Sequence, residues 1–259
     1  MTPGTLEAFI EHLSIPRSCE LNKPVFKKLF LENGVLDIAD KTALKDDVDK
    51  IRWLYTLKPA TINVAAYVDS ERDFSEIAVL QVDLTSTKRL KRIATFMQRS
   101  IPYPLILVFS QENYVCLSVA DKRINQSDKE KWVVEDILYT DWIDLAAPTL
   151  AQAAFLEDCN INSFSFANFL SFYKSLRERV IAINCATHSG RYERDVVGNV
   201  KSKPSESRLE RLREFERLNL QKSEIANKLK KEKQLGRQVE LNTKIKQIND
   251  VIEKIRESI

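Results

Sequence analysis

The stretch that decides the fold is residues 76–109, EIAVLQVDLTSTKRLKRIATFMQRSIPYPLILVF. Residues 76–84 alternate between two faces and predict a β-strand. Residues 87–100 place apolar residues at helical spacing with basic residues between them, which predicts an amphipathic helix. The continuous apolar run 105–109 predicts a central strand covered on both faces. The pattern indicates an α/β or α+β class, with a mixed sheet flanked by helices.

Elements on either side extend this sheet to about five strands. Further strands are expected over residues 61–68, 114–120 and 132–142, with a tight turn at residues 112–113. Further helices are expected over residues 5–13, 25–31, 44–57, 149–157 and 163–183. Pro59 is expected to end the helix over 44–57, because the residue before a proline is biased away from the helical conformation.

The last quarter of the chain has a different character. Its apolar residues are separated by steps of four and three, which predicts a helix that packs against another helix. These residues are Leu241, Ile245, Ile248, Ile252, Ile255 and Ile259. The earlier leucines fall out of this phase around Gly236, so a helical hairpin folding back there is favoured over one long helix with a stutter. We therefore expect a body over residues 1–188, a linker over 189–207 and a C-terminal hairpin or coiled coil over 208–259.

Composition limits the classes of function. The chain has a net charge of +3, and the tail from residue 205 carries 14 Lys and Arg against 10 Asp and Glu, so the body is close to neutral. Four dispersed cysteines and two histidines predict no metal site and reduced thiols, and we expect no cofactor. The first residues lack the pattern of a signal peptide and no apolar run approaches a membrane span, so a cytoplasmic protein without membrane contact is expected.

Catalytic motifs are weak, and the leading expectation is that no residue is catalytic. The five glycines are isolated, so no phosphate-binding loop is predicted. A restriction-type nuclease would need strand carboxylates for a divalent metal, and Asp83 with Glu76 or Asp73 is the candidate set. No acid between residues 60 and 150 is followed by lysine two positions later, and Gln81 occupies a candidate acid position. A degenerate relative of such a nuclease remains equally open.

Two basic groups are candidates for nucleic-acid contact. The first group is Lys88, Arg89, Lys91 and Arg92, and the second is Lys228, Lys230, Lys231, Lys233 and Arg237. Lysine and arginine neutralise backbone phosphates, so such groups would make binding depend on salt. The alternative is that they are solvated helix faces balanced by Glu224, Glu232 and Glu240.

Several short segments carry a resemblance that spans nearly the whole chain. They are IPRS (15–18), LNK (21–23), WLY (53–55), LKPATIN (57–63), IPYP (101–104), YTDW (139–142) and KEKQLGRQVELN (231–242). Together they resemble a bacterial family known as domain of unknown function forty-three ninety-one. The family usually has an aromatic residue and an asparagine where this chain has Leu235 and Gly236. The resemblance implies genomic neighbours, namely SNF2-type helicases and DNA methyltransferases in defence islands, and it transfers no catalytic residue.

These expectations lead to three hypotheses about function. The first is a non-catalytic accessory subunit of an anti-phage system, which binds a helicase, methyltransferase or nuclease partner through its body and C-terminal helices. In that reading Leu241, Ile245, Ile248, Ile252 and Ile255 carry tail packing, to a partner or in a homodimer. The second hypothesis is a metal-dependent, restriction-type nuclease. The third is a DNA-binding module.

Overall fold

A computed structural model describes residues 4–34, 36–125, 127–128, 132–194 and 205–259. The chain divides into two compact units, residues 1–180 and residues 181–259. The predicted linker over 189–207 lies largely outside the described residues.

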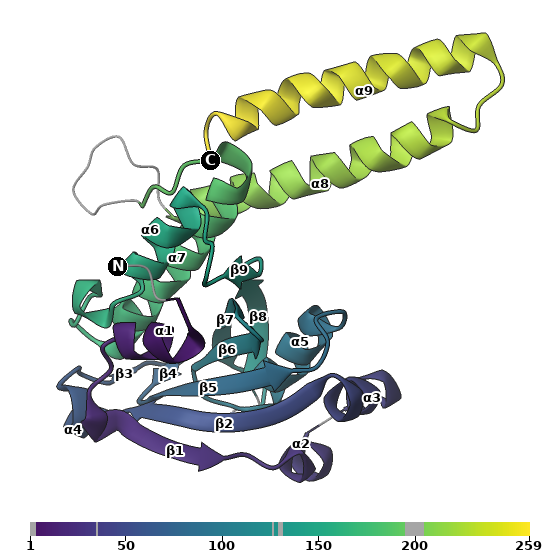
Figure 1. Ribbon diagram of the computed structural model, residues 1–259. Helices are drawn as coiled ribbons and strands as arrows, with labels where there is room; N and C mark the ends of the chain where they lie inside the picture. The colour runs from purple at the N-terminus through teal and green to yellow at the C-terminus, as the bar shows by residue number, and fades with distance from the viewer. Residues whose placement is uncertain (1–3, 35, 126, 129–131, 195–204) are drawn as a thin grey trace. The chain divides into compact units, whose positions relative to one another are not determined.

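The first unit is built on a seven-stranded mixed sheet (Figure 1). Its strands run in the order β1 (Glu20–Pro24), β2 (Val48–Leu57), β5 (Ile77–Leu84), β6 (Leu105–Gln111), β7 (Tyr114–Ile124) and β8 (Trp132–Tyr139), and β9 (Ile143–Asp144) pairs with β7. β5 and β6 are parallel, whereas the other described pairs in this sheet are antiparallel. A separate pair, β3 (Tyr67–Val68) and β4 (Asp73–Phe74), forms a small second sheet.

Helices cover both faces of this sheet. They are α1 (Leu6–His12), α2 (Lys27–Asn33), α3 (Ile38–Asp46), the short α4 (Pro59–Ile62), α5 (Leu90–Ser100), α6 (Leu150–Asp158) and α7 (Phe169–Ser189). α2, α3 and α5 share one core cluster with alternate residues of β5, which include Leu80 and Val82. On α7, the buried Tyr173 hydroxyl accepts a hydrogen bond from the Ala120 N–H and donates one to the Leu105 carbonyl. The predicted mixed sheet flanked by helices is confirmed.

The predicted helix over 44–57 is wrong. α3 ends at Asp46 and the chain continues as strand β2. Two register irregularities, between Val48 and Lys50 and between Trp53 and Tyr55, shift the phase of β2. Its buried residues therefore recur every three positions rather than every two, which imitates helical spacing.

Several smaller predictions also change. Residues 61–68 are mostly not a strand, because Pro59 begins the short helix α4 in the first-turn position that suits proline. The segment 15–24, for which no strand was predicted, contains the edge strand β1, and α7 begins at Phe169 rather than near residue 163. The predictions for β5, α5, β6, the turn at 112–113 and β8 are confirmed in place, with ends shifted by a few residues.

The second unit contains an antiparallel helical hairpin of α8 (Ser205–Leu229) and α9 (Leu235–Arg256), which Figure 1 shows in green and yellow. Ile252 of α9 packs against Phe215 and Leu218 of α8. The hairpin was expected, but its turn lies at residues 230–234. Gly236 belongs to the first turn of α9 and does not have the left-handed conformation common at helix ends, so the predicted fold-back at that glycine is wrong.

Candidate functional site

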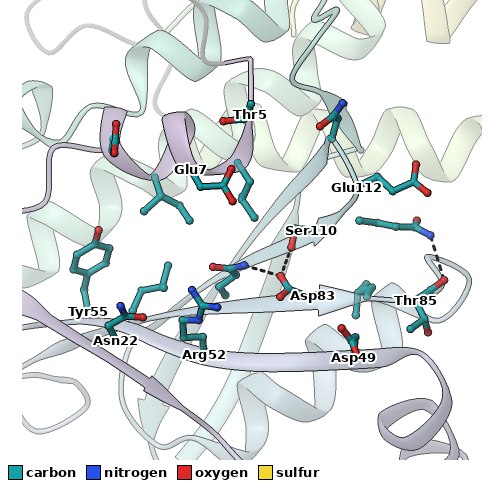
Figure 2. A pocket seen from close by; sticks show the side chains of 18 of the residues that line it. Thr5, Glu7, Asn22, Asp49, Arg52, Tyr55, Asp83, Thr85, Ser110 and Glu112 are labelled. Carbon is teal, nitrogen blue, oxygen red and sulfur yellow. Dashed lines mark hydrogen bonds between the residues drawn. The ribbon is translucent and has the colours of Figure 1, made fainter.

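A cavity of about 770 Å³ lies at the carboxyl ends of the parallel strands β5 and β6 (Figure 2). Its walls come from α1, β1, β2 and the turn that follows β6. In open α/β sheets, ligands commonly bind outside the carboxyl ends of parallel strands. The sheet topology therefore places a hollow where this type of fold usually carries a site.

The cavity wall begins where one face of β5 changes from apolar to polar. Ile77 and Val79 on this face are fully buried, and Gln81 and Asp83 follow them on the same face. Ser110 of β6 lies opposite Asp83 in the strand register. Asp83 Oδ1 accepts hydrogen bonds from Gln81 Nε2 at 2.6 Å and from the Ser110 hydroxyl at 2.5 Å, drawn as dashed lines in Figure 2. Two donors therefore fix the carboxylate at the wall.

The cavity is strongly acidic. Its carboxylates are Glu7, Glu11, Glu20, Asp49, Asp83 and Glu112. Arg52 is the only cation among the residues that line it, so the formal charge of the lining is −5 (one positive and six negative groups). Arg52 is exposed and forms no ion pair with another described residue. A wall of this charge attracts cations and repels phosphates.

Oxygen ligands for a cation are present in the cavity. Asp49 follows the first residue of β2, and its neighbour Lys50 pairs with Asp83 of β5, so the two carboxylates come from adjoining strand ends. Within the described part of the chain, no group of three or more His, Cys, Asp or Glu residues is arranged to hold a metal ion.

The structure does not bring Asp83 and Glu76 together. Glu76 immediately precedes β5, whereas Asp83 is near its carboxyl end. Seven residues of strand separate them by roughly 23 Å. Glu76 instead forms an ion pair with Lys58 at 3.2 Å. Asp49, which the sequence did not single out, is the acid that shares the cavity with Asp83.

Both arginines of the basic group at α5 form ion pairs with carboxylates of the first unit. Arg89 donates to both oxygens of Asp47, at 2.5 and 2.8 Å, and this contact raises the pKa of the guanidinium. Arg92 contacts Asp40 at 2.7 Å and Asp37 at 3.1 Å, which raises its pKa in the same way. In the same group, Lys91 lies 5.3 Å from the centre of the Tyr139 ring, and Lys88 is exposed.

The second basic group lies around the turn of the hairpin. Lys228, Lys230, Lys231, Lys233 and Arg237 are all exposed, from the end of α8 to the first turns of α9. The structure thus separates the two groups by environment: the arginines of the first are in ion pairs with body carboxylates, whereas the second is open to solvent.

The apolar seam of the tail packs mainly inside the hairpin. Ile248 and Ile255 lie against the cluster of Ile252, Phe215 and Leu218. The other two seam residues, Leu241 and Ile245, are half-buried nearer the turn. The seam therefore contacts a helix of its own chain.

Sequence reasoning found Asp83 but missed most of the cavity. Glu7 and Glu11 of α1 are far away in sequence, and β2 was expected to be a helix, which hid Asp49 and Arg52. A signal was nevertheless present in the strands. Gln81, Asp83 and Ser110 interrupt otherwise apolar faces near the ends of two neighbouring strands.

Comparison with known proteins finds a family match. No described helix of this chain is long and apolar enough to span a membrane. No curated protein matches the chain, and no solved structure does. The model of a family described as Domain of unknown function (DUF4391) matches residues 13–252, which is more than half of the 259 residues. The chain therefore belongs to the DUF4391 family.

Proposed function

We propose that this chain is a non-catalytic accessory subunit of a bacterial anti-phage DNA-processing system. Its body binds a helicase, methyltransferase or nuclease partner, and its C-terminal helices provide a second contact or a homodimer. The kind of partner follows from the family resemblance drawn from the sequence. The binding role is supported by an exposed apolar segment at the edge of the sheet.

That segment, which we call the partner edge, covers residues 21–31. It contains four exposed large apolar side chains: Leu21 (39% exposed), Phe26 (69%), Leu29 (50%) and Leu31 (46%). The segment includes most of strand β1, whose one described strand neighbour in the sheet is β2, and continues into α2. An open strand edge beside apolar side chains is a feature that protein interfaces commonly use. This concentration is the observation that carries the proposal.

A second feature agrees with a role other than catalysis. Restriction-type chemistry needs an acid and then a lysine two residues later on the same strand. On β5, Gln81 stands at the acid position and Asp83 stands at the lysine position two residues later. The Gln81 amide donates a hydrogen bond to Asp83. An amide cannot serve as an anionic metal ligand or as a base.

The experiment is a tagged co-purification of the full-length chain, expressed together with its neighbouring helicase and methyltransferase genes. We expect one of these proteins in stoichiometric amount. Phe26→Glu should weaken that complex at least tenfold, because one anchoring aromatic side chain contributes about 1.5–3 kcal/mol. Leu150→Glu is the matched control, since Leu150 is 94% exposed but lies on α6. Equal effects of both changes, or no stoichiometric partner, would count against the proposal.

A second candidate function is a metal-dependent nuclease, favoured by the shared cavity of Asp49 and Asp83. Two carboxylates from adjoining strand ends could hold Mg²⁺ or Mn²⁺, whose charge would offset the acidic wall. The test is cleavage of plasmid DNA and of RNA with either metal. Cleavage that disappears in Asp83→Ala and in Asp49→Ala, but persists in Glu112→Ala, would establish this function. No cleavage with either metal would reject it.

A further inference from the structure

The hairpin turn concentrates exposed positive charge. Its five cations, which we call the cationic tip, are Lys228, Lys230, Lys231, Lys233 and Arg237. Every one of them is exposed, and none forms an ion pair with another residue in the part of the chain that the structure describes. Glu232 is the one acid between residues 228 and 237, so this segment carries a net charge of +4.

The one acid of this segment, Glu232, stabilises the turn through hydrogen bonds. Glu232 Oε1 accepts hydrogen bonds from the backbone N–H of Lys233 at 2.8 Å and of Gln234 at 2.9 Å. The Gln234 N–H is the largest cause that lowers the pKa of Glu232, and Arg237 adds a smaller attraction. Gln238 Nε2 also donates to the Glu232 carbonyl at 2.7 Å. The carboxylate thus holds the turn while the cations around it face solvent.

Two other arginines of the hairpin are neutralised by nearby acids on the same helix. Arg217 pairs with Glu214 at 2.6 Å, and Arg256 pairs with Glu253 at 3.1 Å. These pairs use the three-residue spacing that brings helix side chains together. The excess charge at the tip is therefore a local departure from the pattern along the rest of the hairpin.

A shallow depression of about 410 Å³ lies at the tip. It is lined by Lys228 of α8, Lys231 of the turn and Arg237 of α9, together with Glu232, Glu240 and Leu241. An anion seated there would therefore meet positive charge from both sides of the turn.

We propose that the cationic tip binds the phosphate backbone of nucleic acid. Four of its five cations are lysines, which act as flexible point charges and need no matched fork geometry. Such side chains suit the dense and uniform charge of a duplex, about one phosphate per 1.7 Å of axis. A protein partner with carboxylates in fixed positions would instead favour arginine, because its planar guanidinium binds a carboxylate through two parallel hydrogen bonds. The acidic cavity of the body has the opposite charge, so phosphate contact is assigned to the hairpin.

This site is separate from the partner edge and does not depend on the proposed subunit role. The test is fluorescence anisotropy of the full-length protein with a short labelled DNA duplex, between about 50 and 200 mM salt. Five neutralised phosphates predict that the logarithm of the association constant falls with the logarithm of the salt concentration with a slope of about −4.5. That slope corresponds to an affinity loss of about 500-fold over this range.

A triple variant with Lys228→Gln, Lys231→Gln and Arg237→Gln leaves two tip cations, so its slope should be about −2. The matched control has Lys244→Gln, Lys246→Gln and Lys254→Gln, which removes the same charge from exposed positions of α9 away from the tip. Circular dichroism checks that both variants keep their helices. The control should keep the full slope. Equal loss in both variants overturns the proposal, and so does an absence of duplex binding at about 50 mM salt.

Discussion

Asp83 and Ser110 lie opposite each other on the parallel strands β5 and β6, and the Ser110 hydroxyl donates a 2.5 Å hydrogen bond to Asp83 Oδ1. Gln81 donates to the same oxygen from two residues earlier on β5. Ile77 and Val79 on this face are fully buried. The hydrogen-bonded group therefore marks the point at which the hydrophobic core gives way to the cavity wall.

We expect Ser110→Ala to lower the free energy of unfolding by about 1–2 kcal/mol, because it removes one of two donors to a partly buried carboxylate. Urea unfolding measures this change, and an unaltered m-value would show that the cost lies in the native state. Gln111→Ala is the control on the next residue of β6, where the amide makes a longer 3.3 Å contact to the Thr85 carbonyl. Its cost should stay below about 0.5 kcal/mol. Similar costs for both variants would contradict the assigned role of Ser110.

Tyr173 connects α7 to two strands through a single hydroxyl. It is 2% exposed, and its oxygen contacts the Ala120 N–H and the Leu105 carbonyl, both at 2.9 Å. Tyr173→Phe leaves the Ala120 N–H buried without this partner, whereas the Leu105 carbonyl keeps a hydrogen bond from Gln98 Nε2 at 3.2 Å, so we expect a loss of about 1–3 kcal/mol. Tyr114→Phe, at a side chain that is 43% exposed, should be nearly neutral. A cost under about 1 kcal/mol for Tyr173→Phe would mean that water replaces the hydroxyl.

Lys122 gives the body a specific dependence on pH. Its side chain is almost fully buried, and the ammonium donates to the carbonyls of Ile101 at 2.8 Å and Tyr103 at 2.9 Å. Burial lowers its pKa from 10.5 to about 7. Between these values the unfolded chain binds more protons than the folded chain, so the free energy of unfolding rises with pH, by up to about 1.4 kcal/mol per unit. Below about pH 7 this contribution is absent.

The buried thiols act in the opposite direction at higher pH. Burial raises the pKa of Cys116 from 9.0 to about 12 and also raises the pKa of Cys159. The folded chain then holds protons that the unfolded chain releases, so stability falls above about pH 9. Urea unfolding across this range should show a maximum near pH 9.

Lys122→Met should remove the rise in the free energy of unfolding between pH 7 and 9, and Lys50→Met, at an exposed lysine, should retain it. A rise that survives Lys122→Met would refute the assignment.

The sequence was most informative where one physical effect dominates. The apolar run of β6 was recognised because full burial on both faces leaves a continuous hydrophobic pattern. β5 was recognised from side chains that alternate between two faces of the sheet. β2 was misread because its two irregularities reset the alternation, and tertiary strand pairing decided its conformation. The role of the basic residues at α5 was equally ambiguous in the sequence. The carboxylates that pair with Arg89 and Arg92 precede them by 42 to 55 residues. No local pattern could reveal those pairs.

The last prediction concerns the seam of the hairpin. Ile252 is 3% exposed and contacts Phe215 and Leu218, so Ile252→Asp combined with Ile248→Asp places two carboxylates in this cluster. Burying an unpaired charge costs several kcal/mol, and we therefore expect α8 and α9 to separate and unfold. Residues 1–180 have their own core and should remain folded. Any homodimer that the C-terminal helices form should dissociate as well.

Hydrogen exchange measured by mass spectrometry separates these outcomes, because it reports α9 and β5 independently within the same full-length chain. Amides of α9 should lose protection while those of β5 keep it, and light scattering should report a monomer. Val251→Asp provides the matched control, since it adds a carboxylate at the adjacent residue, which is 44% exposed. Protection lost together in α9 and β5 would show one cooperative unit. Protection retained in α9 would show that contacts other than this seam hold the hairpin.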